Sequence, residues 1–165
     1  MLEYPQLSGQ LAAIERLMLR MSWVEQRRFG QDLSEYGLTV PQFFVLRSIL
    51  QRERQATMSA LADETLQRCA TMTGIVGRLV KLGLVTRERD ARDRRRVLVE
   101  LTLAGREVLD KVRRRREDRL RQTLTHLPPE DAKELLRLLR LYLEAFQQDY
   151  EEADRELRPA LNTNA

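Results

Sequence analysis

Residues 90–105 read DARDRRRVLVELTLAG, and this stretch decides the fold more than any other part of the chain. Within it, apolar residues recur at every second position, which is the period of a β-strand with one buried face. These residues are Val97, Val99 and Leu101. The segment 84–89, LVTRER, has the same period, and the charged residues between the two segments suit an exposed turn. We therefore expect a β-hairpin with a highly charged tip.

A long helix is predicted at the start of the chain, from Leu7 to about Tyr36. Its apolar residues are spaced by three and four positions and line one helix face. They are Leu7, Leu11, Ile14, Met18 and Met21. Gly37 supplies a natural stop, because glycine readily adopts the left-handed backbone that ends many helices.

Two further helices are predicted before residue 65. The first begins at Thr39 as N-cap, with Pro41 in its first turn and Gln42 at the spacing of a capping box. The polar stretch QRERQATM ends its pattern. Ser59 is then expected to cap a helix of about two turns over residues 60–64.

The fourth predicted helix leads into the hairpin. Its buried face comprises Met72, Ile75, Val76, Leu79 and Val80, and Gly83 ends the run. Its opposite face carries small and polar residues. These are Thr71, Thr73, Gly74 and Arg78.

Two long helices are predicted after the hairpin. Thr102 caps the first, and the second begins near Pro129 and reaches about Leu157. The first should bury Leu109, Val112, Leu120 and Leu124. In the second, apolar residues between 135 and 146 surround the whole axis, so we expect another subunit to cover part of them.

Composition excludes several classes of protein. The chain has 165 residues, a formal charge of +4, one cysteine and one histidine, which suits a single globular domain without disulfides or structural zinc. No catalytic group surrounds His126, and no phosphate-binding glycine motif is present, so we expect neither an enzyme nor a cofactor. No apolar run is long enough to span a bilayer, so we expect a cytoplasmic protein without a membrane partner.

The basic charge is concentrated in two segments. Residues 87–96 contain six arginines and three acids, residues 111–121 have a local charge of +5, and residues 144–158 a charge of −4. The arginines of 113–116 cover a full helical turn, so most should be solvated or paired with acids. The hairpin arginines cannot serve a core, and they favour contact with nucleic acid.

Together, these segments resemble the multiple-antibiotic-resistance regulator (MarR) family over residues 33 to 139. Residues 90–105 are similar to the wing signature of that family, in which D-x-R precedes an alternating strand, LT, two residues and Gly. The matching positions are Asp93, Arg95, Val97, Val99, Leu101, Thr102 and Gly105. The segment TMTGIVGRLVKLGLV resembles the recognition helix, and LPPED the start of the last helix.

The resemblance implies a mainly α fold with a small β-hairpin wing, an α+β winged helix-turn-helix. Residues 37–102 would form the DNA-binding domain, residues 1–36 and 103–158 the helical dimerisation region, and residues 159–165 a flexible tail. Two such chains would form a homodimer on successive major grooves of a pseudo-palindromic duplex operator. The implied activity is that of a sequence-specific regulator, more often a repressor.

The resemblance also assigns DNA-binding residues. The recognition helix would present Ala70, Thr71, Thr73, Gly74 and Arg78 to bases and phosphates. In the wing, Arg95 would enter the minor groove. Asp93 would orient Arg95, and the neighbouring arginines would contact phosphates. Those neighbours are Arg92, Arg94 and Arg96.

The predicted recognition helix departs from the family pattern in two ways. The turn before it reads LQRCA, without the usual glycine and Ser/Thr cap. Gly77 stands where the family commonly has an acidic residue. Gly74 and Gly77 each cost a helix about 1 kcal/mol relative to alanine. The helix is therefore either softened in the free protein, or its backbone approaches DNA or a neighbouring helix.

Regulation by a small aromatic or anionic effector is a further implication of the resemblance. The residues that could line an effector cleft are Trp23, Tyr36, Phe43 and Phe44, although side chains of this kind more often belong to an ordinary core. Cys69, near a helix N-terminus and Arg68, is a candidate oxidant sensor or simply a small residue. A winged-helix module that binds an acidic protein is the alternative function, and a small hydrolase or transferase is a more distant one.

Overall fold

A computed structural model describes the backbone of residues 8–52, 55–65, 67–91 and 93–162, and side chains as far as residue 149. It divides into two compact units, Met1–Arg116 and Glu117–Ala165. The fold is mostly helical with one small antiparallel sheet, as the sequence predicts. No helix within the described ranges is long and apolar enough to cross a membrane.

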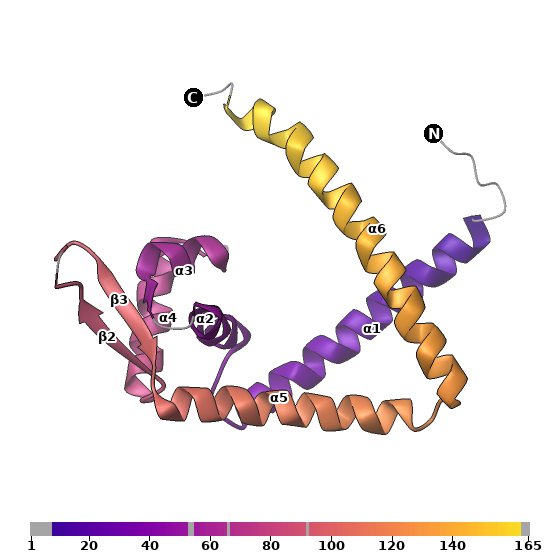
Figure 1. The fold of residues 1–165 in the computed structure, drawn as a ribbon, viewed down its shortest axis with the longest axis horizontal. Coiled ribbons are helices and arrows are strands. Elements are labelled where there is room, and N and C mark those ends of the chain that lie inside the picture. Colours follow the sequence, from indigo (N-terminus) through magenta and orange to yellow (C-terminus); the bar gives the residue numbers. More distant parts are fainter. Residues whose placement is uncertain (1–7, 53–54, 66, 92, 163–165) are drawn as a thin grey trace. The chain divides into compact units, whose positions relative to one another are not determined.

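In its described residues, the first unit combines five helices with three strands (Figure 1). In chain order the elements are α1 (Ser8–Ser34), α2 (Val40–Gln51), β1 (Ala56–Thr57), α3 (Met58–Glu64), α4 (Cys69–Lys81), β2 (Val85–Arg89), β3 (Val97–Leu101) and α5 (Leu103–Leu124), whose last turns belong to the second unit. The strand order is β1-β3-β2, so β3 is central and β2 is an edge strand. The predicted hairpin is therefore β2–β3.

Local sequence signals set most helix ends as expected. The backbone N–H of Thr39 donates to Gln42 Oε1 at 2.8 Å, which is one half of the predicted capping box of α2. Gly83, beyond α4, has a φ of 71°, a left-handed conformation that glycine adopts without steric cost. α6 (Pro129–Asn162) begins at the predicted proline.

The start of α3 differs from the prediction. Thr57, not Ser59, is its N-cap, and Thr57 Oγ1 accepts from the backbone N–H of Ala60 at 3.3 Å. Thr57 also belongs to β1, which pairs with β3 and was not predicted. A two-residue strand carries no period of its own, and its extended backbone comes from pairing with β3.

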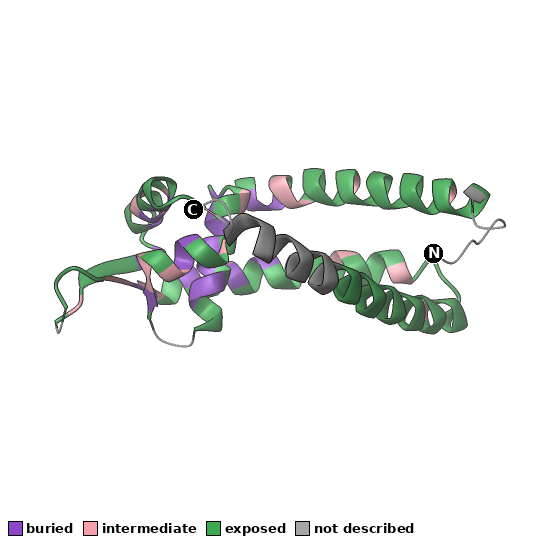
Figure 2. Ribbon diagram, turned by 90° about the horizontal axis from the view of Figure 1, so that it is seen from above, coloured by how far each residue is buried: buried purple, intermediate pink, exposed green. Residues whose placement is uncertain are grey.

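The core lies where α2, α3 and α4 meet the base of the hairpin. Figure 2 shows the buried residues gathered there, while the outer part of the hairpin is exposed. Met72, Val76 and Leu79 of α4 pack in one cluster with Val85 and Val99 of the hairpin. This shared core holds the predicted recognition helix against the base of the wing.

A junction at Thr102 ties α4, β2, β3 and α5 together. Thr102 Oγ1 donates to the carbonyl of Gly83 at 2.7 Å and accepts from the backbone N–H of Gly105 at 3.0 Å. The backbone N–H of Thr102 donates to the carbonyl of Leu84 at 3.1 Å. A Cβ on Gly105 would lie 2.1 Å from that Leu84 oxygen, so the junction closes only around glycine.

A second contact joins α1 to α5 through Arg115. Its Nε lies 2.8 Å from Oδ1 of the buried Asp32, and its Nη2 donates to Glu35 Oε1 at 2.7 Å. Arg116 places its guanidinium over the ring of Phe29, 5.0 Å from the centroid. These contacts fix the C-terminal part of α1, whose predicted apolar face is otherwise exposed at Leu11, Ile14, Met18 and Met21. Leu7 lies outside the described residues.

The second unit comprises the end of α5 and the long helix α6. The prediction that α5 buries Leu120 is wrong, because that side chain is 60% exposed, whereas Leu109 and Val112 are buried as expected. Large apolar side chains on several sides of α6 are exposed as well. They are Leu135, Leu136, Leu138, Leu139, Leu141, Tyr142, Leu143 and Phe146.

The end of α6 also differs from the prediction. The helix extends to Asn162, so residues 159–162 of the expected tail are helical. Ala160 and Leu161, which follow Pro159, are good helix formers.

The Gly105→Ala substitution should destabilise the fold by about 3 kcal/mol, because the new methyl group would overlap the Leu84 carbonyl and force the backbone apart. Urea unfolding at a fixed protein concentration, followed by circular dichroism, measures the change. Gly74→Ala is the matched control, since a Cβ there meets nothing within 4 Å and should leave stability equal or higher. A Gly105→Ala protein as stable as wild type would contradict this account of the junction.

Candidate nucleic-acid interface

The helix-turn-helix consists of α3, the turn after it, and α4. The turn is held from the end of α3: Thr65 Oγ1 donates to the Leu61 carbonyl at 2.7 Å, and the backbone N–H of Gln67 donates to the Ala62 carbonyl at 2.9 Å. Arg68 is the N-cap of α4, and its side chain makes no capping hydrogen bond. The unusual turn sequence thus leaves the first turn of α4 without a side-chain cap.

One face of α4 is exposed along its whole length. With Met72, Val76 and Leu79 buried, the helical period turns the opposite face to solvent. Val80 was expected on the buried face but is exposed, because it lies at the edge of that apolar stripe. The solvent face carries the five predicted residues together with a half-buried glycine and a basic residue that were not assigned. Its members are Ala70, Thr71, Thr73, Gly74, Gly77, Arg78 and Lys81.

The two glycines of this face have no packing role inside the chain. A Cβ at Gly74 or Gly77 would meet no atom within 4 Å among the described residues. No helix of the described chain therefore packs closely against these two glycines. The other explanation given above is that the glycines let a binding partner approach the helix backbone.

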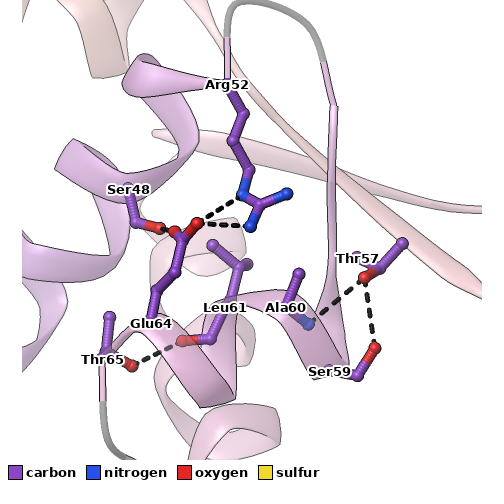
Figure 3. Close-up of polar contacts among 8 residues, drawn as sticks. All are labelled: Ser48, Arg52, Thr57, Ser59, Ala60, Leu61, Glu64 and Thr65. Carbon is purple, nitrogen blue, oxygen red and sulfur yellow. Dashed lines mark hydrogen bonds and ion pairs between the residues drawn. The ribbon is translucent and has the colours of Figure 1, made fainter.

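A charged network that the sequence did not reveal fixes α3 against α2 (Figure 3). The carboxylate of Glu64, at the end of α3, accepts from Ser48 Oγ and from Arg52 Nε, the latter at 2.9 Å. Hydrogen bonds from Arg52 and then from Ser48 hold the pKa of Glu64 below its usual value. The turn between α3 and α4 starts at the next residue, so this network positions the turn.

The wing tip is closed by backbone and carboxylate hydrogen bonds. Asp93 Oδ1 accepts from the backbone N–H of Arg95 at 3.0 Å, and the Asp93 carbonyl accepts from that of Arg96 at 2.9 Å. The Arg96 carbonyl in turn accepts from the backbone N–H of Asp90 at 3.0 Å. Asp93 therefore orients the backbone at Arg95, rather than holding its guanidinium. Arg92 lies outside the described residues.

The two basic segments differ in how they are neutralised. In α5, Arg115 pairs with Asp32 of α1 and with Glu35, which follows α1, and Arg113 lies 3.5 Å from Asp110. The interpretation of that run as partly paired is confirmed for these two residues. In the described part of the wing, Arg94, Arg95 and Arg96 make no ion pair or side-chain hydrogen bond and are exposed. The wing thus presents positive charge that the protein does not neutralise.

The aromatic residues suggested for an effector cleft are divided between core and surface. Phe43 is buried and packs edge-to-face on Phe29, with centroids 4.9 Å apart, whereas Phe44 is 45% exposed. Tyr36 packs against the core, and Trp23 is exposed beneath Arg27. The structure does not bring these four rings together around one cavity. Cys69 is exposed as the first residue of α4.

Comparison with known proteins agrees with this geometry. A model of the MarR family matches residues 36–96, which run from the end of α1 to the wing tip. The chain is 26% identical over 121 residues to the HTH-type transcriptional regulator YsmB of Bacillus subtilis, covering 73% of this chain and 82% of that protein. The relatives found are transcriptional regulators and not enzymes.

Solved structures show the same fold. A MarR family protein from Bacillus stearothermophilus superposes with a TM-score of 0.73 at 27% identity, over 84% of this chain and 96% of that one. A point mutant of S. aureus MepR, bound to an oligodeoxyribonucleotide, superposes with a TM-score of 0.67 at 19% identity, over 81% and 97%. The second likeness concerns the fold alone.

The Glu64→Gln substitution should destabilise the protein at pH 7 and lose its effect as the pH falls. A carboxyl whose pKa is lowered in the folded state stabilises that state fully above its usual pKa of about 4.5, and this contribution disappears on protonation. Urea unfolding of wild type and variant at pH 7 and pH 3.5 measures the difference. Asp63→Asn, an exposed neighbour, is the control. A gap that stays constant between the two pH values would contradict the prediction.

Two substitutions at Asp93 separate its possible roles. Asp93→Asn keeps a side-chain oxygen for the backbone N–H of Arg95 but removes the charge, whereas Asp93→Ala removes both. We expect the Asn variant to bind duplex DNA within about twofold of wild type, and the Ala variant roughly fivefold more weakly, from the loss of about 1 kcal/mol of loop order. Fluorescence anisotropy measures both. Equal loss in the two variants would show that the charge of Asp93 is what matters.

Proposed function

Because the chain is a DNA-binding transcriptional regulator of the MarR family, we propose that it is a homodimer that represses transcription from a pseudo-palindromic operator. One observation supports this proposal above all. The exposed face of α4 and the wing arginines, which are not neutralised, are held by the same core. A helix of this kind fits the major groove, and a hairpin beside it reaches the backbone or the minor groove.

Each element has a distinct part in the proposed recognition. Thr71 and Thr73 of α4 offer hydroxyls to base edges, and Arg78 offers a guanidinium to a base or phosphate. Arg95 enters the minor groove, where narrow A·T-rich segments concentrate negative potential. Arg94 and Arg96 contact phosphates, which adds affinity without sequence preference. The MepR mutant bound to an oligodeoxyribonucleotide gives a precedent for this fold in a complex with DNA.

The homodimer is supported by the apolar surface that one chain leaves uncovered. The exposed side chains of α1 and α6 are larger and more numerous than a soluble monomer usually presents in one segment. A second copy would cover them and would set two α4 helices at a fixed separation. Helix-turn-helix dimers read half-sites about 10 bp apart.

The last part of the proposal is that a small aromatic or anionic effector changes the affinity of the protein for its operator. The exposed rings of Trp23 and Phe44 lie on α1 and α2, one in the proposed dimerisation region and one in the proposed DNA-binding domain. A small aromatic carboxylate that lowers operator affinity of the wild type, and loses that effect in Phe44→Ala, would support this part. An operator affinity that no such compound changes would contradict it.

The first experiment is selection of random duplex DNA by the purified protein, with the stoichiometry measured by sedimentation. An enriched inverted repeat with half-sites one helical turn apart, bound by two chains, is the expected result. Absence of enrichment by a folded dimer would overturn the proposal and favour a module that binds an acidic protein. Reporter transcription that rises rather than falls with operator occupancy would make the protein an activator.

Substitutions on the two elements should have different effects on the selected operator. Arg95→Ala should weaken specific binding and lower the slope of log affinity against log salt by about two per dimer, because one positive charge in the minor groove is lost from each chain. Thr71→Ala or Thr73→Ala should instead change the preferred bases, with little change in salt slope. Wild-type behaviour of Arg95→Ala and of both threonine variants would refute these assignments.

A further inference from the structure

The register of the wing hairpin sorts its charges onto two faces. Residues opposite one another in an antiparallel pair point to the same face of the sheet, and the faces alternate along each strand. Val85 pairs with Leu101, Arg87 with Val99, and Arg89 with Val97. Since Val85 and Val99 are buried in the core, Arg87 and Arg89 lie on the core face of the hairpin.

That face is the side on which α4 lies. Val85 and Val99 share their core cluster with Met72, Val76 and Leu79 of α4. Towards the tip the hairpin runs beyond the core, so Arg87 and Arg89 are exposed although they are on the core face (Figure 2). They therefore occupy the stretch of strand between the core contact with α4 and the wing tip.

The acids of the hairpin lie on the other face. Thr86 pairs with Glu100, and Glu88 with Leu98, so both glutamates point away from the arginine side. Opposite Arg87 and Arg89 stand only valines. Among the described residues, neither guanidinium makes an ion pair or a hydrogen bond. The local sequence RER looks partly neutralised, but the strand pleat separates its charges.

We propose that Arg87 and Arg89 form a phosphate-binding track on the α4 side of the wing, which extends the DNA contact from the wing tip back along β2 towards α4. This inference rests on the proposed DNA-binding function and adds two contact residues to it. Arginine suits the task because its planar guanidinium matches phosphate oxygens and is always charged. Phosphate contacts position the protein and carry no sequence information, so this track serves affinity and register.

Protection of an exposed strand edge is the competing explanation. β2 is an edge strand, and charged side chains on such strands prevent pairing with other chains. Charges of either sign on either face serve that purpose, and Glu88 already supplies one. Edge protection does not explain why both positive charges share the α4 side and both negative charges the other.

The test measures salt dependence on two duplexes, the selected operator and an unrelated sequence of equal length. Arg87→Gln and Arg89→Gln should each lower the salt slope by about two per dimer, since each phosphate contact contributes about 0.9 and a dimer has two wings. The affinity loss should be the same factor on both duplexes. Arg89→Lys should recover most of the slope, because lysine binds phosphate as a point charge.

Glu88→Gln is the matched control, because it changes the charge of the same exposed strand by one unit on the opposite face. It should leave the salt slope unchanged. Slopes for Arg87→Gln and Arg89→Gln equal to wild type, or shifted no more than by Glu88→Gln, would overturn the track. Aggregation of the arginine variants with unaltered slope would support edge protection instead.

Failure of this inference is distinguishable from failure of the proposed function. A wild-type protein that selects an operator, with arginine variants that match its slope and affinity, overturns only the track. A wild-type protein that prefers no sequence and shows no salt-dependent duplex binding overturns both. Thermal unfolding of each variant shows whether it is folded, and substitutions at these exposed positions should leave the melting temperature close to that of wild type.

Discussion

The Thr102 junction is the constraint on which the interface depends. A single hydroxyl donates to the carbonyl after α4 and accepts from the first turn of α5, while the Thr102 N–H binds the Leu84 carbonyl at the start of β2. α4 ends, β2 begins, β3 ends and α5 begins within a few residues of this point. This arrangement requires Gly105, because the absence of a Cβ lets the first turn of α5 contact the Leu84 carbonyl. A recognition helix and a wing can address one ligand only if their separation is fixed, and this junction fixes it.

Electrostatics then divides the arginines by what surrounds them. Arg115 lies beside Asp32 and Glu35, which raise its pKa still further, and it serves to hold α1 on α5. The guanidinium groups of Arg94, Arg95 and Arg96, at the wing tip, make no ion pair with an acid of the described chain. Their charge is therefore available to an anionic partner, at no cost of breaking an internal pair. Counting charges along the chain gives the two segments similar weight, although Arg113 and Arg115 of the second segment are paired with acids.

The helices α1 and α6 differ from this core in that much of their apolar surface is exposed. α1 reaches the core only through its C-terminal part, and α6 presents large apolar side chains on several sides. Surfaces of this kind raise the free energy of an isolated chain in water, and association of two chains removes them from solvent. This is the physical basis on which a homodimer is proposed.

Most of the fold was accessible from the sequence, because helix periods, glycine stops, capping residues and strand alternation are signals within a few residues. They located α1, α2, α4, α5, the hairpin and the start of α6, and the face of α4 that carries Thr71 and Arg78 followed from its buried residues. Tertiary structure decided the rest. β1 exists only by pairing with β3, Glu64 meets Ser48 and Arg52 across two helices, and Asp93 binds a backbone N–H. The faces of Arg87 and Arg89 follow from the strand register, which becomes fixed only when β2 pairs with β3 and Val85 and Val99 are buried in the core.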